Sequence, residues 1–148
     1  MKILITGGGG FIGSHVADLL ARQTEHDLIL LDRIIPPGFE HLNTKTLDLA
    51  DQEALDKLFA AQKPDCVIHF AALTNAYESV GEAASYDYNN VVLTSKLIDQ
   101  CLHHNVGKFI FASTSAVYGP RHDLPITENA AFEPMNPIRP AKSNVRRF

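Results

Sequence analysis

The sequence lacks several features that would define a class of protein. Its 148 residues contain no tryptophan and only two cysteines, Cys66 and Cys101, which lie in apolar segments without metal-ligand spacing and are predicted to be reduced, structural thiols. No apolar run approaches the roughly 18 residues of a membrane span, and no signal-peptide pattern is present, so we expect a cytoplasmic protein with no membrane partner. The net charge of −4 offers no basic surface for nucleic acid.

The histidines do not indicate a metal site. The sequence has seven of them, and His103 and His104 are adjacent. Adjacent residues of a helix do not share a face, so we interpret this pair as a solvated helix end and predict no metal.

What the sequence does contain is an alternation of strand and helix patterns. Short apolar runs predict strands, and apolar residues at helical spacing predict the helices between them. The predicted strands cover residues 2–6, 28–31, 44–47, 65–70 and 109–112, and the predicted helices cover 12–23, 51–62 and 82–104. Such alternation predicts an α/β fold with a doubly wound parallel sheet whose ligand crevice lies at the carboxyl ends of the strands. Residues 119–148 hold five prolines and are predicted to be loop.

A glycine-rich turn connects the first predicted strand to the first helix. The run Thr6-Gly-Gly-Gly-Gly-Phe-Ile-Gly13 contains G-x-G-x-x-G, and Asp32 follows at the end of the second strand. Such a turn lets a pyrophosphate approach the main chain, and an acidic residue in this place binds the adenosine ribose. The pattern predicts a dinucleotide site, with NAD favoured over NADP because the Asp32 carboxylate would repel a 2′-phosphate. Arg33 keeps NADP as an alternative, since an arginine there could bind that phosphate.

Further motifs resemble those of the extended short-chain dehydrogenase/reductases, in particular the NAD-dependent nucleotide-sugar epimerase/dehydratase family and its UDP-glucose 4-epimerase branch. They are the glycine turn through His15, Asp48-Leu49, Val67-Ile-His-Phe-Ala-Ala-Leu73, Glu78-Ser-Val80, Asn89-Asn-Val91, Ser113-Thr-Ser-Ala-Val-Tyr-Gly119 and Pro125-Ile-Thr-Glu128. The resemblance implies a Rossmann-like domain over residues 1–137, NAD as cofactor, and epimerisation of a UDP-hexose at C4.

The resemblance also assigns site residues. Thr114 matches the Ser or Thr that bonds the sugar 4-oxygen, and Lys142 matches the lysine of Tyr-x-x-x-Lys, so these two are the candidate catalytic residues. The cofactor positions are Gly7, Gly10, Phe11, Ile12, Gly13, Asp32, Asp48, Leu49, Phe70, Ala71, Ala72, Thr74 and Asn89. Thr74 departs from the lysine that is frequent at its position in the epimerases. Tyr118 is interpreted as structural.

The sequence departs from the family near its end. Ile138 stands where the family has the tyrosine that serves as general base, and Pro140 interrupts the helix that should carry Lys142. The resemblance therefore implies a truncated sheet of about five strands without the C-terminal substrate lobe, and impaired activity. We treat residues 138–148 as a divergent tail, and an out-of-frame origin just after Pro137 is one hypothesis for it.

Three other interpretations stay open. The chain is either a nucleotide-sugar dehydratase or other epimerase, a non-catalytic NAD-binding or scaffold fragment, or a fragment that does not fold because a strand edge is exposed. Ser115 and Ala116 follow Thr114 where a dehydratase would have acidic residues, which disfavours a dehydratase and leaves another epimerase open. Family dimers use two helices per subunit, around Gln100 and after Lys142, and the sequence lacks the second, which argues against a homodimer.

Overall fold

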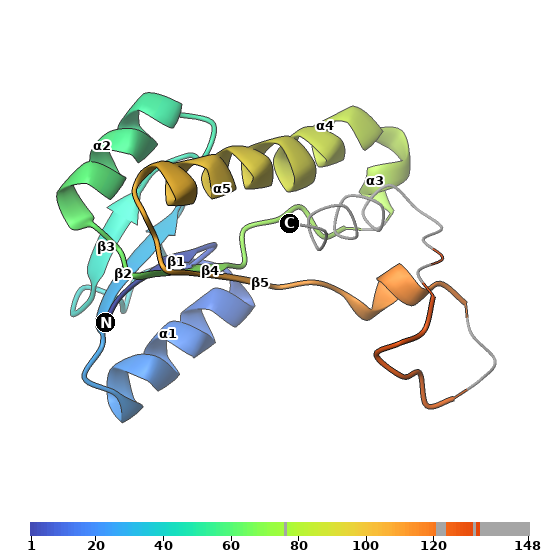
Figure 1. Ribbon diagram of the computed structural model, residues 1–148, viewed down its shortest axis with the longest axis horizontal. Helices are drawn as coiled ribbons and strands as arrows, with labels where there is room; N and C mark the ends of the chain where they lie inside the picture. The colour runs from blue at the N-terminus through green and yellow to red at the C-terminus, as the bar shows by residue number, and fades with distance from the viewer. Residues whose placement is uncertain (76, 121–123, 132, 134–148) are drawn as a thin grey trace. The chain divides into compact units, whose positions relative to one another are not determined.

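The computed structural model describes residues 1–75, 77–120, 124–131 and 133 (Figure 1). The chain divides into two compact units, and each is described by itself. The first unit combines Met1–Ala72 with Lys96–Ala112, and the second combines Leu73–Ser95 with Ser113–Phe148.

The first unit is built on a five-stranded parallel sheet. In the order β3-β2-β1-β4-β5, its strands are β3 (Asn43–Thr46), β2 (Asp27–Asp32), β1 (Lys2–Thr6), β4 (Cys66–His69) and β5 (Lys108–Phe111). The predicted fold class and number of strands are confirmed. Strands are added outward from β1 to β3, and the chain then crosses to β4 on the other side of β1. This change of direction between β1 and β4 is where open α/β sheets bind ligands.

Helices cover both faces of this sheet. Figure 1 shows α1 (Phe11–Gln23) on one face, with α2 (Gln52–Gln62) and α5 (Leu93–His103) on the other. Ile3 and Ile5 of β1 pack in a cluster with Ala17 of α1, and Leu4 between them is fully buried as well. Because successive side chains of a strand point to opposite faces, both faces of β1 are apolar, as a centrally placed parallel strand requires.

The sequence predicts α2 accurately. Asp51 caps its first turn, with one carboxylate oxygen accepting a hydrogen bond from the Ala54 N–H at 3.0 Å. Leu55, Leu58 and Phe59 form the buried face, and the helix ends at Lys63, whose φ of 48° is left-handed.

The second unit departs from the prediction. The helix expected over residues 82–104 is present as a continuous helical run from Ala83 to His103, but it is not uniform: α4 (Ala83–Asp87) leads into η1, a π-helix over Tyr88–Val92, before α5 begins. A π turn inserts one residue into the helical repeat, and the apolar spacing does not reveal it. Two further short helices, α3 (Glu78–Gly81) and η2 (Ser115–Tyr118), were not predicted.

The last part of the chain follows the prediction where the structure describes it. Residues 119, 120, 124–131 and 133 form no helix or strand, in agreement with the proline content. No helix among the described residues combines the length and apolar character needed to cross a membrane.

Candidate functional site

The glycine turn after β1 has a backbone that other residues would not adopt. Gly7 has a φ of +73°, and a Cβ on it would lie 2.5 Å from the backbone nitrogen of Ala71. The turn therefore lies directly against the chain leaving β4. The contact places the glycines at the change of direction in the sheet.

Helix α1 also packs closely on this turn. A Cβ on Gly13 would lie 2.1 Å from the carbonyl oxygen of Gly7, closer than real Cβ contacts. The Gly10 N–H donates to the same carbonyl at 3.1 Å. The close approach of α1 to the turn therefore depends on residue 13 having no side chain.

The first turn of α1 is open to an anion. Its N-cap, Gly10, offers no side-chain hydrogen bond, and the first turn contains no acidic residue. The N–H groups at the start of a helix have no partner within the helix and carry partial positive charge. Phe11 and Ile12, the first two residues of the helix, are exposed. The residues present thus fit a dinucleotide pyrophosphate.

Asp32 is tied to the glycine turn. One of its carboxylate oxygens accepts a hydrogen bond from the Gly9 N–H at 3.0 Å, and the other accepts from the Arg33 N–H at 2.7 Å. These bonds fix the carboxylate at the end of β2, beside the turn. Gly9 was missing from the predicted site, although the run of four glycines was a signal for it. The Arg33 side chain is exposed.

The predicted adenine-binding pair follows β3. The Leu47 N–H donates to the Asp32 carbonyl at 2.9 Å, which brings the segment beside the end of β2. Asp48 is exposed and accepts from the Ala50 N–H at 2.8 Å, whereas Leu49 is buried. Asp48 is therefore accessible to a ligand, whereas Leu49 is buried in the protein.

The end of β4 completes the first unit's part of the site. The Phe70 N–H donates to the Thr6 carbonyl at 2.9 Å, and Phe70, Ala71 and Ala72 are half-buried. The structure thus brings the predicted cofactor positions of this unit to the carboxyl ends of its strands. They are Gly7, Gly10, Phe11, Ile12, Gly13, Asp32, Asp48, Leu49, Phe70, Ala71 and Ala72.

The second unit contains the remaining cofactor positions. Thr74 is exposed, and Asn89 is half-buried in η1 with its amide donating to the Ser85 carbonyl at 2.9 Å. Its neighbour Asn90 is buried and bonds both backbone groups of Leu73, accepting from the N–H at 2.8 Å and donating to the carbonyl at 2.9 Å. Asn90 therefore holds the segment leading to Thr74, a role that the sequence did not reveal.

The hydroxyl-rich segment also belongs to the second unit. Thr114 is half-buried, and its carbonyl accepts from the Val117 N–H at 3.4 Å as η2 begins. The Ser113 hydroxyl oxygen is buried, with no hydrogen-bond partner among the described residues. Lys142 and Ile138 lie outside the described residues, so the catalytic roles of Thr114 and Lys142 stay predictions.

The two cysteines are unbonded and buried, as predicted. Burial, together with a smaller effect of the neighbouring Cys66, raises the pKa of Cys101 to about 12. Burial also raises the pKa of Cys66. Neither thiol is poised as a nucleophile at neutral pH.

Comparison with known proteins agrees with this geometry. The model of the NAD dependent epimerase/dehydratase family matches residues 3–142. The UDP-glucose 4-epimerase of Halalkalibacterium halodurans is 38% identical, over 100% of this chain and 45% of its own length. This chain thus spans less than half the length of that relative.

Solved structures give the same result. UDP-glucose 4-epimerase from Brucella ovis in complex with NAD has a TM-score of 0.93 and 36% identity, covering 99% of this chain and 46% of that one. The enzyme from Bifidobacterium longum in complex with NAD⁺ and UDP has a TM-score of 0.92 and 31% identity, covering 99% and 47%.

Proposed function

Because the chain belongs to the NAD dependent epimerase/dehydratase family, we propose that it supplies the NAD-binding part of a nucleotide-sugar 4-epimerase. The observation that carries the proposal is the glycine turn. It packs against Ala71, it leads into a helix start without a side-chain cap, and its Gly9 N–H donates a hydrogen bond to Asp32. In this proposal residues 1–137 form the NAD-binding domain. NAD is the cofactor, as in the Brucella and Bifidobacterium structures.

Three segments of the first unit would bind different parts of the cofactor. The main-chain N–H groups of Phe11 and Ile12 bind the pyrophosphate, and the Asp32 carboxylate accepts hydrogen bonds from the adenosine ribose hydroxyls. Asp48 and Leu49 line the adenine. The Asp32 charge disfavours a 2′-phosphate, which selects NAD over NADP.

The chemical step is assigned to the second unit and to the family pattern. A bound NAD would supply reversible hydride transfer to and from C4 of the sugar. Thr114 keeps the hydroxyl that the family uses to hold the sugar 4-oxygen by a hydrogen bond. The substrate class is a UDP-hexose, by analogy with the UDP that the Bifidobacterium enzyme binds.

One residue favours a second function, NAD binding without turnover. Ile138 stands at the position of the family's tyrosine base, four residues before Lys142. An aliphatic side chain cannot accept the proton of the 4-hydroxyl, and general acid–base catalysis contributes about 10²–10⁴-fold. We therefore expect this chain to bind NAD and to turn over UDP-galactose at least about 100-fold more slowly than an intact family member.

Two measurements test the proposal. Calorimetric titration with NAD and NADP is made on the chain, on Asp32→Asn and on the control Asp27→Asn, which changes an exposed carboxylate at the opposite end of β2. Loss of a charge-assisted hydrogen bond of about 1.5–3 kcal/mol predicts a Kd for NAD that rises about tenfold or more in Asp32→Asn. Asp27→Asn should bind like the native chain.

The outcomes separate the alternatives. Failure to bind NAD, or equal binding in Asp32→Asn, contradicts the proposed cofactor site. NAD binding without conversion of UDP-galactose supports the non-catalytic function, and conversion at a normal family rate refutes it.

A further inference from the structure

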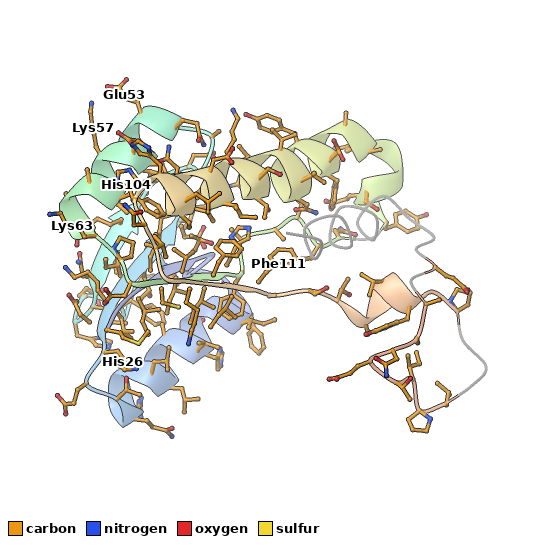
Figure 2. All side chains as sticks on the ribbon, in the orientation of Figure 1. His26, Glu53, Lys57, Lys63, His104 and Phe111 are labelled. Atoms are coloured by element: carbon orange, nitrogen blue, oxygen red, sulfur yellow. The ribbon has the colours of Figure 1, made fainter. Side chains whose placement is uncertain are left out.

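The first unit contains a cluster of metal-ligating side chains away from the glycine turn. Asp56 of α2, His103 at the end of α5 and His104 just beyond it each offer one ligand atom, and these three atoms lie within 4.8 Å of one another. The Nε2 atom of His104 is 2.8 Å from the Asp56 carboxylate. Figure 2 shows His104 where the end of α5 comes beside α2.

The end of α5 explains how adjacent histidines come together. The Val106 N–H donates to the Cys101 carbonyl, the Asn105 N–H donates to the Leu102 carbonyl, and Asn105 is left-handed with a φ of 56°. This pattern is a Schellman motif, in which the helix stops at a fixed residue with fixed geometry. His104 is therefore the C-cap residue, and His103 is the last residue of the helix.

The expectation of a solvated histidine pair is wrong for His104. Its side chain is only 16% exposed, it bonds Asp56, and its ring lies 5.6 Å from the ring of Phe59. The ring of His103 is exposed and lies 4.8 Å from that of His104, at an interplanar angle of 87°. One ligand is thus held by packing, and its neighbour His103 is exposed to solvent.

From this geometry we propose that Asp56, His103 and His104 bind a divalent transition-metal ion. Two imidazoles and one carboxylate suit zinc, copper or nickel, with water completing the coordination. Two ligand atoms 2.8 Å apart, each about 2.1 Å from an ion, subtend about 84° there, close to a cis pair in tetragonal geometry. Rotation of the exposed His103 ring supplies the third bond.

Such an ion would tie α2 to α5 on one face of the sheet. The carboxylate and the imidazole already in contact belong to different elements, Asp56 to α2 and His104 to the end of α5. Because the ion binds only the folded arrangement, binding raises the melting temperature. None of these three ligands belongs to the proposed NAD or sugar site.

The test is a titration of the metal-free 148-residue chain with zinc chloride, followed by calorimetry and by thermal melting in far-UV circular dichroism. The native chain should bind one ion and melt at a higher temperature in its presence. His103→Ala, which removes an exposed ligand without disturbing the core, should bind at least tenfold more weakly and lose the thermal shift. The matched control, His41→Ala, removes an exposed histidine outside the cluster and should leave both unchanged.

A second variant guards against indirect effects. Asp56→Asn keeps an oxygen to accept the hydrogen bond of His104 but loses the negative charge, so it should fold normally and bind zinc more weakly. Cobalt(II) bound at the site should show visible d–d absorption that disappears in His103→Ala. No binding at a 1:1 ratio, or equal weakening by His41→Ala, overturns the proposal.

Discussion

Replacing Gly13 by alanine tests whether the contact between α1 and the glycine turn is as close as the structure indicates. A Cβ at residue 13 would lie 2.1 Å from the Gly7 carbonyl oxygen. The same substitution at Gly10 would place a Cβ 3.3 Å from the same oxygen. The two variants therefore add one methyl group against one atom at two distances.

The expected magnitude follows from two opposing effects. Alanine in a helix is favoured over glycine by about 1 kcal/mol. Relief of the contact at residue 13 requires the Gly7 carbonyl to retreat by about 1 Å, and overpacking of this kind costs about 3 kcal/mol at the upper end of its range. Gly13→Ala should therefore lower the free energy of unfolding by about 2 kcal/mol.

Urea denaturation followed by far-UV circular dichroism measures the change, since the chain has no tryptophan for fluorescence. With a slope of about 2 kcal/mol per molar urea, the midpoint of Gly13→Ala should fall by about 1 M. Gly10→Ala should lose less than about 1 kcal/mol, the cost of a poorer N-cap. A Gly13→Ala variant more stable than the native chain would follow helix propensity alone and would refute the close packing.

Three further predictions concern stability. Thr6→Val removes the buried 2.5 Å contact with Nδ1 of His69 and should cost about 1–3 kcal/mol in urea denaturation; an unchanged midpoint would show that the pair contributes nothing. Asp51→Ala removes the cap that accepts from the Ala54 N–H and should cost about 1 kcal/mol, whereas Asp51→Asn, which also caps, should cost less; equal losses would argue against capping. Burial raises the pKa of Cys101 from 9.0 to about 12. Above pH 9 the thiol therefore loses its proton more readily in the unfolded chain than in the folded one. The free energy of unfolding should fall as the pH rises from about 9 to about 12. Cys101→Ala should show a shallower loss over that range, and parallel pH profiles of the two proteins would contradict the shift.

Local patterns were sufficient to predict most elements of the first unit. The strands β1, β2 and β4 are apolar runs buried on both faces, and α2 carries its N-cap at Asp51. In these segments chemical type and spacing alone determine the structure, because burial demands apolar side chains and a helix start demands a side-chain acceptor. The glycine turn and Asp32 were also predicted from local chemical type. The turn needs residues without a Cβ, and the carboxylate comes at the end of β2.

These local patterns could not predict contacts between residues that are far apart in the sequence. The π turn η1 coincides with the buried Asn90, whose amide meets the backbone of Leu73, 17 positions away. The approach of His104 to Asp56 joins residues 48 positions apart. Adjacency in the sequence suggested a solvated pair, and only the packing of α2 beside the end of α5 removes one of the two rings from water.

The sequence by itself determined the alternation of strands and helices, the glycine turn and the acidic residue after β2, because each depends on the conformation and solvation of a few neighbouring residues. The tertiary structure decided which glycine has no room for a Cβ, which asparagine is buried and which histidine faces a carboxylate. These properties depend on how closely separate segments approach, and a close-packed interior fixes that approach to within a few tenths of an ångström.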